Sequence, residues 1–160
     1  MLKPERHDPE RHDVAAPAGL GRLSVTRAED EIAVLVLGHG AGGGIGSFDL
    51  QALARGLPSR GVTVALFEQP WVLAGRRVAG PPASLDEAWT PALTVVREVV
   101  DAPLFVGGRS AGARVACRTL PPDAHGLVLA SFPLHPPGQP DASRIHELAD
   151  AAASALVLQG

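Results

Sequence analysis

The chain has 160 residues, of which 46% are hydrophobic, and it carries a formal net charge of −3. This length allows one domain with a substantial core. The small acidic excess provides no positive field for nucleic acid or for an anionic membrane surface. A single cysteine excludes a disulfide framework and a cysteine-rich metal site, and no apolar run reaches the roughly 18 residues of a membrane-spanning helix. We therefore expect a cytoplasmic protein with no metal, no cofactor, and neither a nucleic-acid nor a membrane partner.

The first 18 residues are polar and contain a short tandem repeat. Glu5-Arg-His-Asp8 is followed by Glu10-Arg-His-Asp13. Two His-Asp pairs could hold a metal ion, but a charged terminal stretch of this kind is more often solvated. We expect a disordered tail over residues 1–18 and a single domain over residues 19–160.

The first strands should follow this tail. Residues 22–27 alternate apolar and polar side chains, as an edge strand does, and residues 32–37 are an unbroken apolar run of strand length. Residues 28–31 read as a turn between them. The pattern predicts an antiparallel hairpin that joins 22–27 to 32–37.

A glycine-rich segment, residues 38–44, follows the buried strand. Gly38, Gly40 and Gly43 fit G-x-G-x-x-G, and Glu68 closes the next strand, where a dinucleotide-binding fold keeps its ribose-binding acid. The distance from the glycines to Glu68 is somewhat long, and further loop residues separate the glycines from the next helix. Dinucleotide binding therefore stays an alternative.

The next elements are a helix, a strand and a loop. Leu50, Leu53 and Leu57 have helical spacing, and Val62–Glu68 is a second apolar strand. Residues 70–82 show no period and are expected to be a long loop.

A second helix should follow this loop. Ser84 and Glu87 form a capping box, which places the N-cap of the helix at Ser84. Pro91 should bend this helix or shift its start.

Residues 104–114 carry the most informative pattern of the chain. A strand over 104–107 leads into Gly108-Arg-Ser-Ala-Gly112, which fits G-x-S-x-G, and a helix over 111–119 follows. A serine on such a turn exposes its hydroxyl, and the glycines permit the close approach of strand and helix. We interpret Ser110 as a nucleophile; the alternative is a simple turn built from small residues.

The rest of the chain continues this alternation with a strand over 126–131, a helix over 143–150 and a strand over 155–159. Strands that alternate with helices predict an α/β fold with a mostly parallel sheet and helices on both faces. The strand ends at residues 38, 69, 108 and 132 would then share one edge, which is where such sheets bind ligands.

The sequence resembles the α/β-hydrolase superfamily, and within it the small dienelactone-hydrolase-like proteins grouped with the hydrolase-like domain of NSL-complex subunit 3 and testis-expressed protein 30. The segments that carry the resemblance are Leu37–Gly44, Glu68–Trp71, Gly75–Arg77, Gly107–Arg114 and Phe132–Pro137.

This resemblance implies a serine hydrolase that acts on a small ester, thioester or lactone through an acyl-enzyme. Ser110 would be the nucleophile, and the backbone N–H groups of Ala111 and Ala41, with Gly42 as a near alternative to Ala41, would form the oxyanion hole. His39 would orient the glycine loop. Some relatives are known more as complex subunits than as enzymes, so a non-catalytic interaction module with a protein partner is the alternative.

The triad acid and histidine are missing from the expected places. A triad hydrolase keeps the chain order Ser, Asp/Glu, His, and the sequence stops after the strand that the acid should follow. We expect both residues to lie in a C-terminal part absent from this sequence. His135, after strand 126–131 at the correct edge, could serve as a base or anchor its loop. Surface, packing or capping roles are expected for His125, His146 and Asp141.

Three arginines suggest a substrate class. Arg109 adjoins the proposed nucleophile, and Arg76 and Arg77 lie in the loop expected above the same edge. Guanidinium groups favour carboxylate or phosphate, so we expect the substrate to carry an acid group, with His135 as a further contact. The alternative is that these arginines pair with Glu68 and Asp86 and hold loops together.

Overall fold

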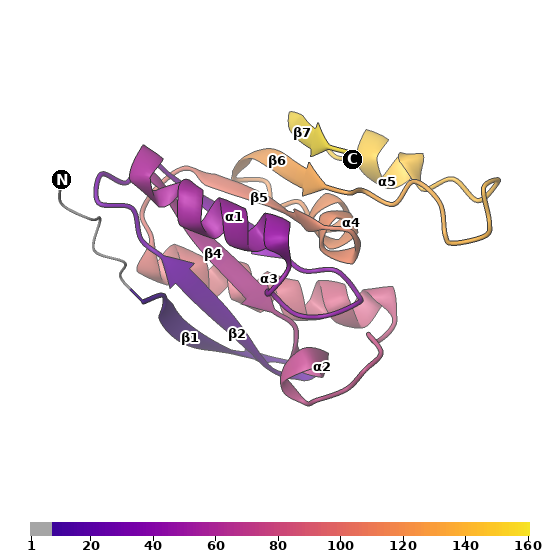
Figure 1. The fold of residues 1–160 in the computed structure, drawn as a ribbon, viewed down its shortest axis with the longest axis horizontal. Helices are drawn as coiled ribbons and strands as arrows, with labels where there is room; N and C mark the ends of the chain where they lie inside the picture. Colours follow the sequence, from indigo (N-terminus) through magenta and orange to yellow (C-terminus); the bar gives the residue numbers. More distant parts are fainter. Residues whose placement is uncertain (1–7) are drawn as a thin grey trace.

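A computed structural model describes residues 8–160 and contains one seven-stranded sheet with helices on both faces (Figure 1). The strands are β1 (Glu10–Ala16), β2 (Gly19–Thr26), β3 (Ala33–Gly38), β4 (Val62–Glu68), β5 (Leu104–Arg109), β6 (Ala124–Ala130) and β7 (Ala155–Leu158). The helices are α1 (Phe48–Gly56), α2 (Pro70–Leu73), α3 (Pro82–Val99), α4 (Ala111–Arg118) and α5 (Ile145–Ala149), with a 3₁₀ turn, η1 (Pro58–Arg60).

The strand order is β1-β2-β4-β3-β5-β6-β7. β1 and β2 form an antiparallel hairpin, and β2 also pairs antiparallel with β4. All pairs from β4 to β7 are parallel. The predicted fold class, a mostly parallel α/β sheet with an N-terminal antiparallel hairpin, is therefore confirmed.

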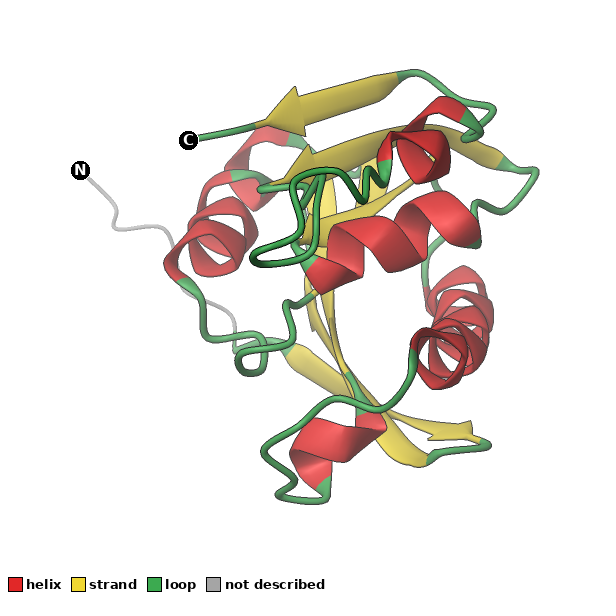
Figure 2. Ribbon diagram, turned by 90° about the vertical axis from the view of Figure 1, so that its right-hand side faces the viewer, coloured by secondary structure: helices red, strands yellow, loops and turns green. Residues whose placement is uncertain are grey.

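Burial of the central strands on both faces explains their continuous apolar runs. Along β3, Val34 and Val36 face a core that also contains α3 and α4, whereas Leu35 and Leu37 face a smaller core beneath α1. Figure 2 shows the twisted sheet with helices on either side of it. Trp89 of α3 is fully buried in the larger core and meets Phe67 edge to face.

Two expectations for the N-terminal region are wrong. Residues 10–16 form β1 rather than part of a disordered tail, because Val14 is buried in the core and the charged residues pair across the hairpin, as Asp13 does with Arg22. The hairpin joins β1 to β2 instead of joining 22–27 to 32–37, since β3 inserts between β4 and β5. Residues 5–7 of the first repeat lie outside the described residues.

The structure also differs from two predictions for the central region. The loop 70–82 contains α2, which Pro70 opens at its first position. The capping box at Ser84 does not form, because α3 already begins at Pro82 and the Ser84 hydroxyl donates to the carbonyl of Pro81. Pro91 lies inside α3, which continues through it to Val99.

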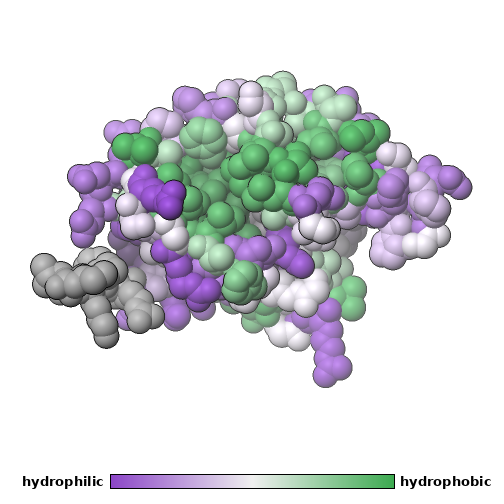
Figure 3. Space-filling view, turned by 45° about the horizontal axis from the view of Figure 1, so that its top comes forward, coloured by the Kyte–Doolittle hydropathy of each residue, from purple (hydrophilic) through white to green (hydrophobic). Residues whose placement is uncertain are grey.

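A broad groove runs beside α1. Figure 3 shows an apolar area on this side of the molecule. The groove has a volume of about 630 Å³ and is lined by α1, by the end of β6 and by the C-terminal end of β7, and Leu158 is 45% exposed. Within residues 8–160, no helix is both long and apolar enough to cross a membrane.

Candidate active site

The candidate site lies where the strand order reverses. From β3 the chain moves to β4 on one side, and it then returns to place β5 on the other side of β3. The carboxyl ends of β3 and β5 are therefore adjacent, with Gly38 opposite Gly108. Open α/β sheets bind ligands at such a switch point.

Ser110 occupies the turn between β5 and α4 with a strained backbone. Its φ of 53° and ψ of −113° lie outside the regions that residues with a Cβ prefer. Its N–H donates to the carbonyl of Ala130 at 2.9 Å, and its carbonyl accepts from the N–H of Arg114. Ser131, after β6, also has a positive φ, so two strained serines follow adjacent strands. Such strain gathers at functional sites when the surroundings hold it in place.

Glycines around Ser110 permit this turn to form. A Cβ on Gly112 would lie 2.4 Å from the backbone of Gly38, and a Cβ on Gly108 would lie 2.6 Å from Gly38 and Gly112. A Cβ on Gly107 would overlap the carbonyl of Val128. The start of α4 therefore packs backbone to backbone against β3, as the G-x-S-x-G pattern predicts for a nucleophile elbow.

Both expected oxyanion donors border the same pocket. Ala111 is the first residue of α4, and an N–H at this position has no partner within its helix. Ala41 lies across the pocket mouth in the glycine loop. A Cβ placed on Gly40 would be only 3.4 Å from the Cβ of Ser110, so the loop backbone passes directly beside the serine. This arrangement suits an oxyanion bound between Ala41 and Ala111.

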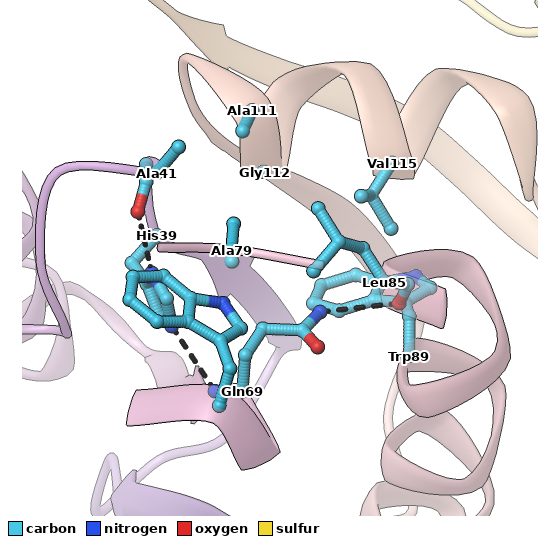
Figure 4. Close-up of a pocket in the computed structure, with 12 residues that line it drawn as sticks. His39, Ala41, Gln69, Ala79, Leu85, Trp89, Ala111, Gly112 and Val115 are labelled. Atoms are coloured by element: carbon cyan, nitrogen blue, oxygen red, sulfur yellow. Dashed lines mark hydrogen bonds between the residues drawn. The ribbon is translucent and has the colours of Figure 1, made fainter. Parts of the chain in front are cut away.

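His39 is held in a single neutral form. Its Nδ1 donates to the carbonyl of Gly40 at 2.7 Å, and its Nε2 accepts from the N–H of Gln69 at 3.0 Å (Figure 4). Only 4% of the residue is exposed, and burial lowers the pKa of the imidazole. Trp71 packs against its ring edge. Both ring nitrogens are therefore occupied, and His39 joins the glycine loop to the end of β4, the arrangement expected of a residue that orients the loop.

Arg109 also connects elements around the site. Its Nε donates to Asp49 of α1 at 2.9 Å. Asp49 further accepts hydrogen bonds from the Ser47 hydroxyl and the Leu50 N–H. Burial opposes ionisation of Asp49, but these hydrogen bonds and the charge of Arg109 outweigh it, so the pKa of Asp49 is lowered. Arg109 thus secures α1 to the turn that carries Ser110.

The other predicted contacts are dispersed. Arg76 and Arg77 are exposed after α2, and His135 is exposed after β6. The alternative ion pair of these arginines with Asp86 does not form, because Asp86 pairs with Arg118 at 2.7 Å. Within the described part of the chain, no hydrogen bond links a histidine to Ser110. His125 lies beside Phe105, and His146 and Asp141 are exposed, with Asp141 outside the N-cap of α5.

The sequence did not reveal which residues form the wall of the pocket. Gln69 is buried and its side-chain amide donates to the carbonyl of Leu85, which ties the end of β4 to α3. Trp71 and Ala79 add two further sides. The motif Glu68–Trp71 marked this segment, but its aperiodic sequence gave no sign that it turns towards Ser110.

The geometry does not favour the dinucleotide alternative. Helix α1 begins at Phe48, five residues beyond Gly43, so the G-x-G-x-x-G glycines do not open a helix as that fingerprint requires. Among residues 8–160, no group of three or more His, Cys, Asp or Glu side chains is placed to hold a metal ion.

Comparisons with known proteins show the same fold in several solved structures. An α/β serine hydrolase without a lid from Xanthomonas campestris is 16% identical, with a TM-score of 0.68 over 99% of this chain and 86% of that chain. An α/β serine hydrolase homologue from Coxiella burnetii is 17% identical, with a TM-score of 0.76 over 96% of this chain and 74% of that one. A putative α/β hydrolase from Agrobacterium tumefaciens is 19% identical, with a TM-score of 0.75 over 94% and 70%. Residues 31–160 match the family described as alpha/beta hydrolase domain, and the chain therefore belongs to the α/β hydrolases.

Proposed function

We propose that this protein is a serine hydrolase that transfers the acyl group of a small ester, thioester or lactone to water through Ser110. The observation that carries the proposal is the strained φ of Ser110 at a glycine-packed strand–helix turn beside the Ala41 loop. A dienelactone-hydrolase-like relationship, suggested by the sequence motifs, would be consistent with this substrate class.

The reaction begins when the Ser110 Oγ attacks the carbonyl carbon and transfers its proton to a base. The carbonyl oxygen becomes an oxyanion and accepts hydrogen bonds from the N–H groups of Ala41 and Ala111. Collapse of this intermediate expels the protonated leaving group and leaves an acyl-enzyme, which water then hydrolyses by the same steps.

The base in this scheme is not His39. Its Nε2 already accepts from Gln69, and its Nδ1 carries the proton that Gly40 accepts. His39 instead acts as a positioning residue for the oxyanion loop. A base in this mechanism must reach Ser110 from the side of the strand edge that the glycine loop leaves open.

An acid group on the substrate is a further part of the proposal. Arg76 and Arg77 are exposed after α2 and are available to an anion, whereas Arg109 is engaged with Asp49. Arg76→Glu should lower kcat/KM for anionic esters by about tenfold and leave neutral esters unchanged; equal effects on both would exclude this role.

The second candidate function is a non-catalytic module that binds a protein partner. It is favoured by one observation: within residues 8–160, no histidine is hydrogen bonded to Ser110. A module of this kind would keep the fold and the strained turn without turnover.

The test uses the protein made from its native gene. We would first measure its intact mass, and then label it with a fluorophosphonate probe and compare the Ser110→Ala variant. Labelling that disappears in Ser110→Ala supports the hydrolase. A folded native product that shows neither labelling nor ester hydrolysis would overturn it and favour the interaction module. Thermal stabilisation by NAD, without labelling, would instead revive the dinucleotide alternative.

A further inference from the structure

A narrow pocket beside the glycine loop has room for one water molecule. Ala41 and Ala111 lie at its mouth, and Trp71, Leu85 and Trp89 are among the residues that wall it (Figure 4). The centre of a water-sized sphere can move through only about 10 Å³ of this space. A volume of this size is about the least that a cavity needs to hold a water, and it is too small for two.

The indole N–H of Trp89 is an unsatisfied polar group on the wall of this pocket. Trp89 is fully buried, and its Nε1 is the only buried side-chain nitrogen or oxygen within residues 8–160 that has no hydrogen-bond partner. A buried tryptophan N–H usually finds a partner, because an unpaired donor loses its hydration without compensation. The described residues supply no acceptor for this N–H, so an acceptor has to come from another molecule.

A second polar atom on the wall is free to bind such a molecule. The amide nitrogen of Gln69 donates to the carbonyl of Leu85, whereas no described residue donates to the amide oxygen. Leu85 and Trp89 are four residues apart in α3 and therefore lie on the same face, so the Gln69 amide is held one helical turn from the position of Trp89. Both nitrogens of His39 are engaged, and the other side chains of the lining are apolar apart from the indole of Trp71.

We propose that the pocket holds one ordered water, which accepts a hydrogen bond from Trp89 Nε1 and donates one to Gln69 Oε1. Size and chemistry together select this ligand. A water can both accept and donate within this volume, whereas an apolar group of the same size would leave the indole N–H unpaired. Two hydrogen bonds to the protein are within the range found for buried waters.

The water completes a chain of hydrogen bonds from α3 to the glycine loop. Gln69 is bound to α3 through its amide nitrogen and to His39 through its backbone N–H, and His39 in turn donates to the carbonyl of Gly40. The water adds a second link between Gln69 and α3. The pocket then belongs to the scaffold of the site, and the inference does not depend on hydrolysis at Ser110.

Nuclear magnetic resonance of the full chain tests the proposal directly. With ¹⁵N-labelled tryptophan the spectrum should contain two indole N–H peaks, because Trp71 and Trp89 are the only tryptophans of the chain, and Trp71→Phe assigns them. A water held on Trp89 should produce a cross-peak between the indole N–H and the water resonance, with opposite signs in nuclear Overhauser and rotating-frame Overhauser spectra. Equal signs, which indicate proton exchange with solvent, or the absence of a cross-peak would overturn the proposal.

Two variants should displace the water by filling its space with carbon. Ala79→Val enlarges a half-buried wall residue in the loop before α3, and Val115→Ile enlarges a wall residue on α4. Each should abolish the cross-peak of Trp89 and shift its indole proton upfield, because the hydrogen bond is lost. Ala74→Val is the matched control, since Ala74 is exposed at the end of α2 and does not line the pocket, and it should leave the cross-peak unchanged. A cross-peak that survives both fillings, or that the control removes equally, would refute a water in this pocket.

Discussion

A methyl group added at Gly112 should disrupt the packing of the Ser110 turn. The helical backbone of Gly112 tolerates alanine, so backbone conformation is not the obstacle. The new Cβ would lie 2.4 Å from the carbonyl carbon and oxygen of Gly38, and 2.9 Å from the carbonyl oxygen of His39. These are backbone atoms at the end of β3 and in the residue that follows it, and they cannot move aside as a flexible side chain would.

The expected size of the effect follows from overpacking. Inserting a methyl group into a tight core costs about 1–3 kcal/mol, and the absence of flexible neighbours favours the upper part of this range. For a domain of this size, about 2–3 kcal/mol corresponds to a melting temperature lowered by roughly 4–12 °C. The displaced loop should also weaken any fluorophosphonate labelling of Ser110.

The assay is thermal unfolding followed by circular dichroism, with Gly56→Ala as the matched control. Gly56 ends α1, and a Cβ there would meet nothing within 4 Å. Its replacement should leave stability unchanged or raise it by up to about 1 kcal/mol. If Gly112→Ala unfolds at the same temperature as Gly56→Ala, the backbone contact between α4 and β3 is not as close as described.

Three other predictions concern single side chains. His39→Ala should lower kcat/KM about 100-fold by releasing the oxyanion loop, whereas the pKa values in the pH–rate profile should not shift, because His39 stays neutral. Asp49 has a pKa below its ordinary value, so its carboxylate stabilises the fold above that value and the contribution is lost as the pH falls through the lowered pKa. Urea unfolding of Asp49→Asn should therefore show a deficit of about 1 kcal/mol or less at pH 7, which shrinks below about pH 4; a constant deficit would exclude this ionic origin. Burial raises the pKa of the Cys117 thiol to about 11, so iodoacetamide should modify it at pH 8 only after unfolding, as intact mass would show.

The central strands were predictable from sequence because both of their faces are buried. The predicted strand over 62–68 coincides with β4, and the predicted strand over 32–37 differs from β3 by a single residue at each end. A strand between two layers of helices needs apolar side chains at every position, and this continuous signal is easy to recognise.

β1 was missed for the opposite reason. Val14 is its only fully buried side chain, and the rest is dominated by charges that resemble a solvated tail. These charges are compatible with a strand because Arg22 and Arg27 of the neighbouring segment pair with Asp13 and Glu10. Such cross-strand pairs depend on the register of the hairpin, which the pattern of a single segment does not reveal.

The parts of the site that lie within one short segment could be predicted from the sequence. The contacts between distant segments could not. The turn at Ser110 and the glycine loop each lie within a few residues of sequence, so their motifs are visible. The pair Arg109–Asp49 joins residues 60 positions apart. The contact from Gln69 to His39 depends on β3 and β4 being neighbours in parallel register. Only the strand order brings these residues together.

The same contacts explain how the site can be rigid although its residues come from several segments of the chain. Gly38, Gly108 and Gly112 fix the distance between β3 and the elbow by backbone contact alone. His39 then fixes the glycine loop against β4 through two hydrogen bonds that leave its ring no free nitrogen. The proposed oxyanion site therefore needs no base to keep its shape. Ser110 and the backbone N–H groups around it can therefore keep this arrangement either in an active hydrolase, where a separate histidine reaches Ser110, or in a binding module that has none. Labelling of Ser110 distinguishes these two cases because it depends on the base.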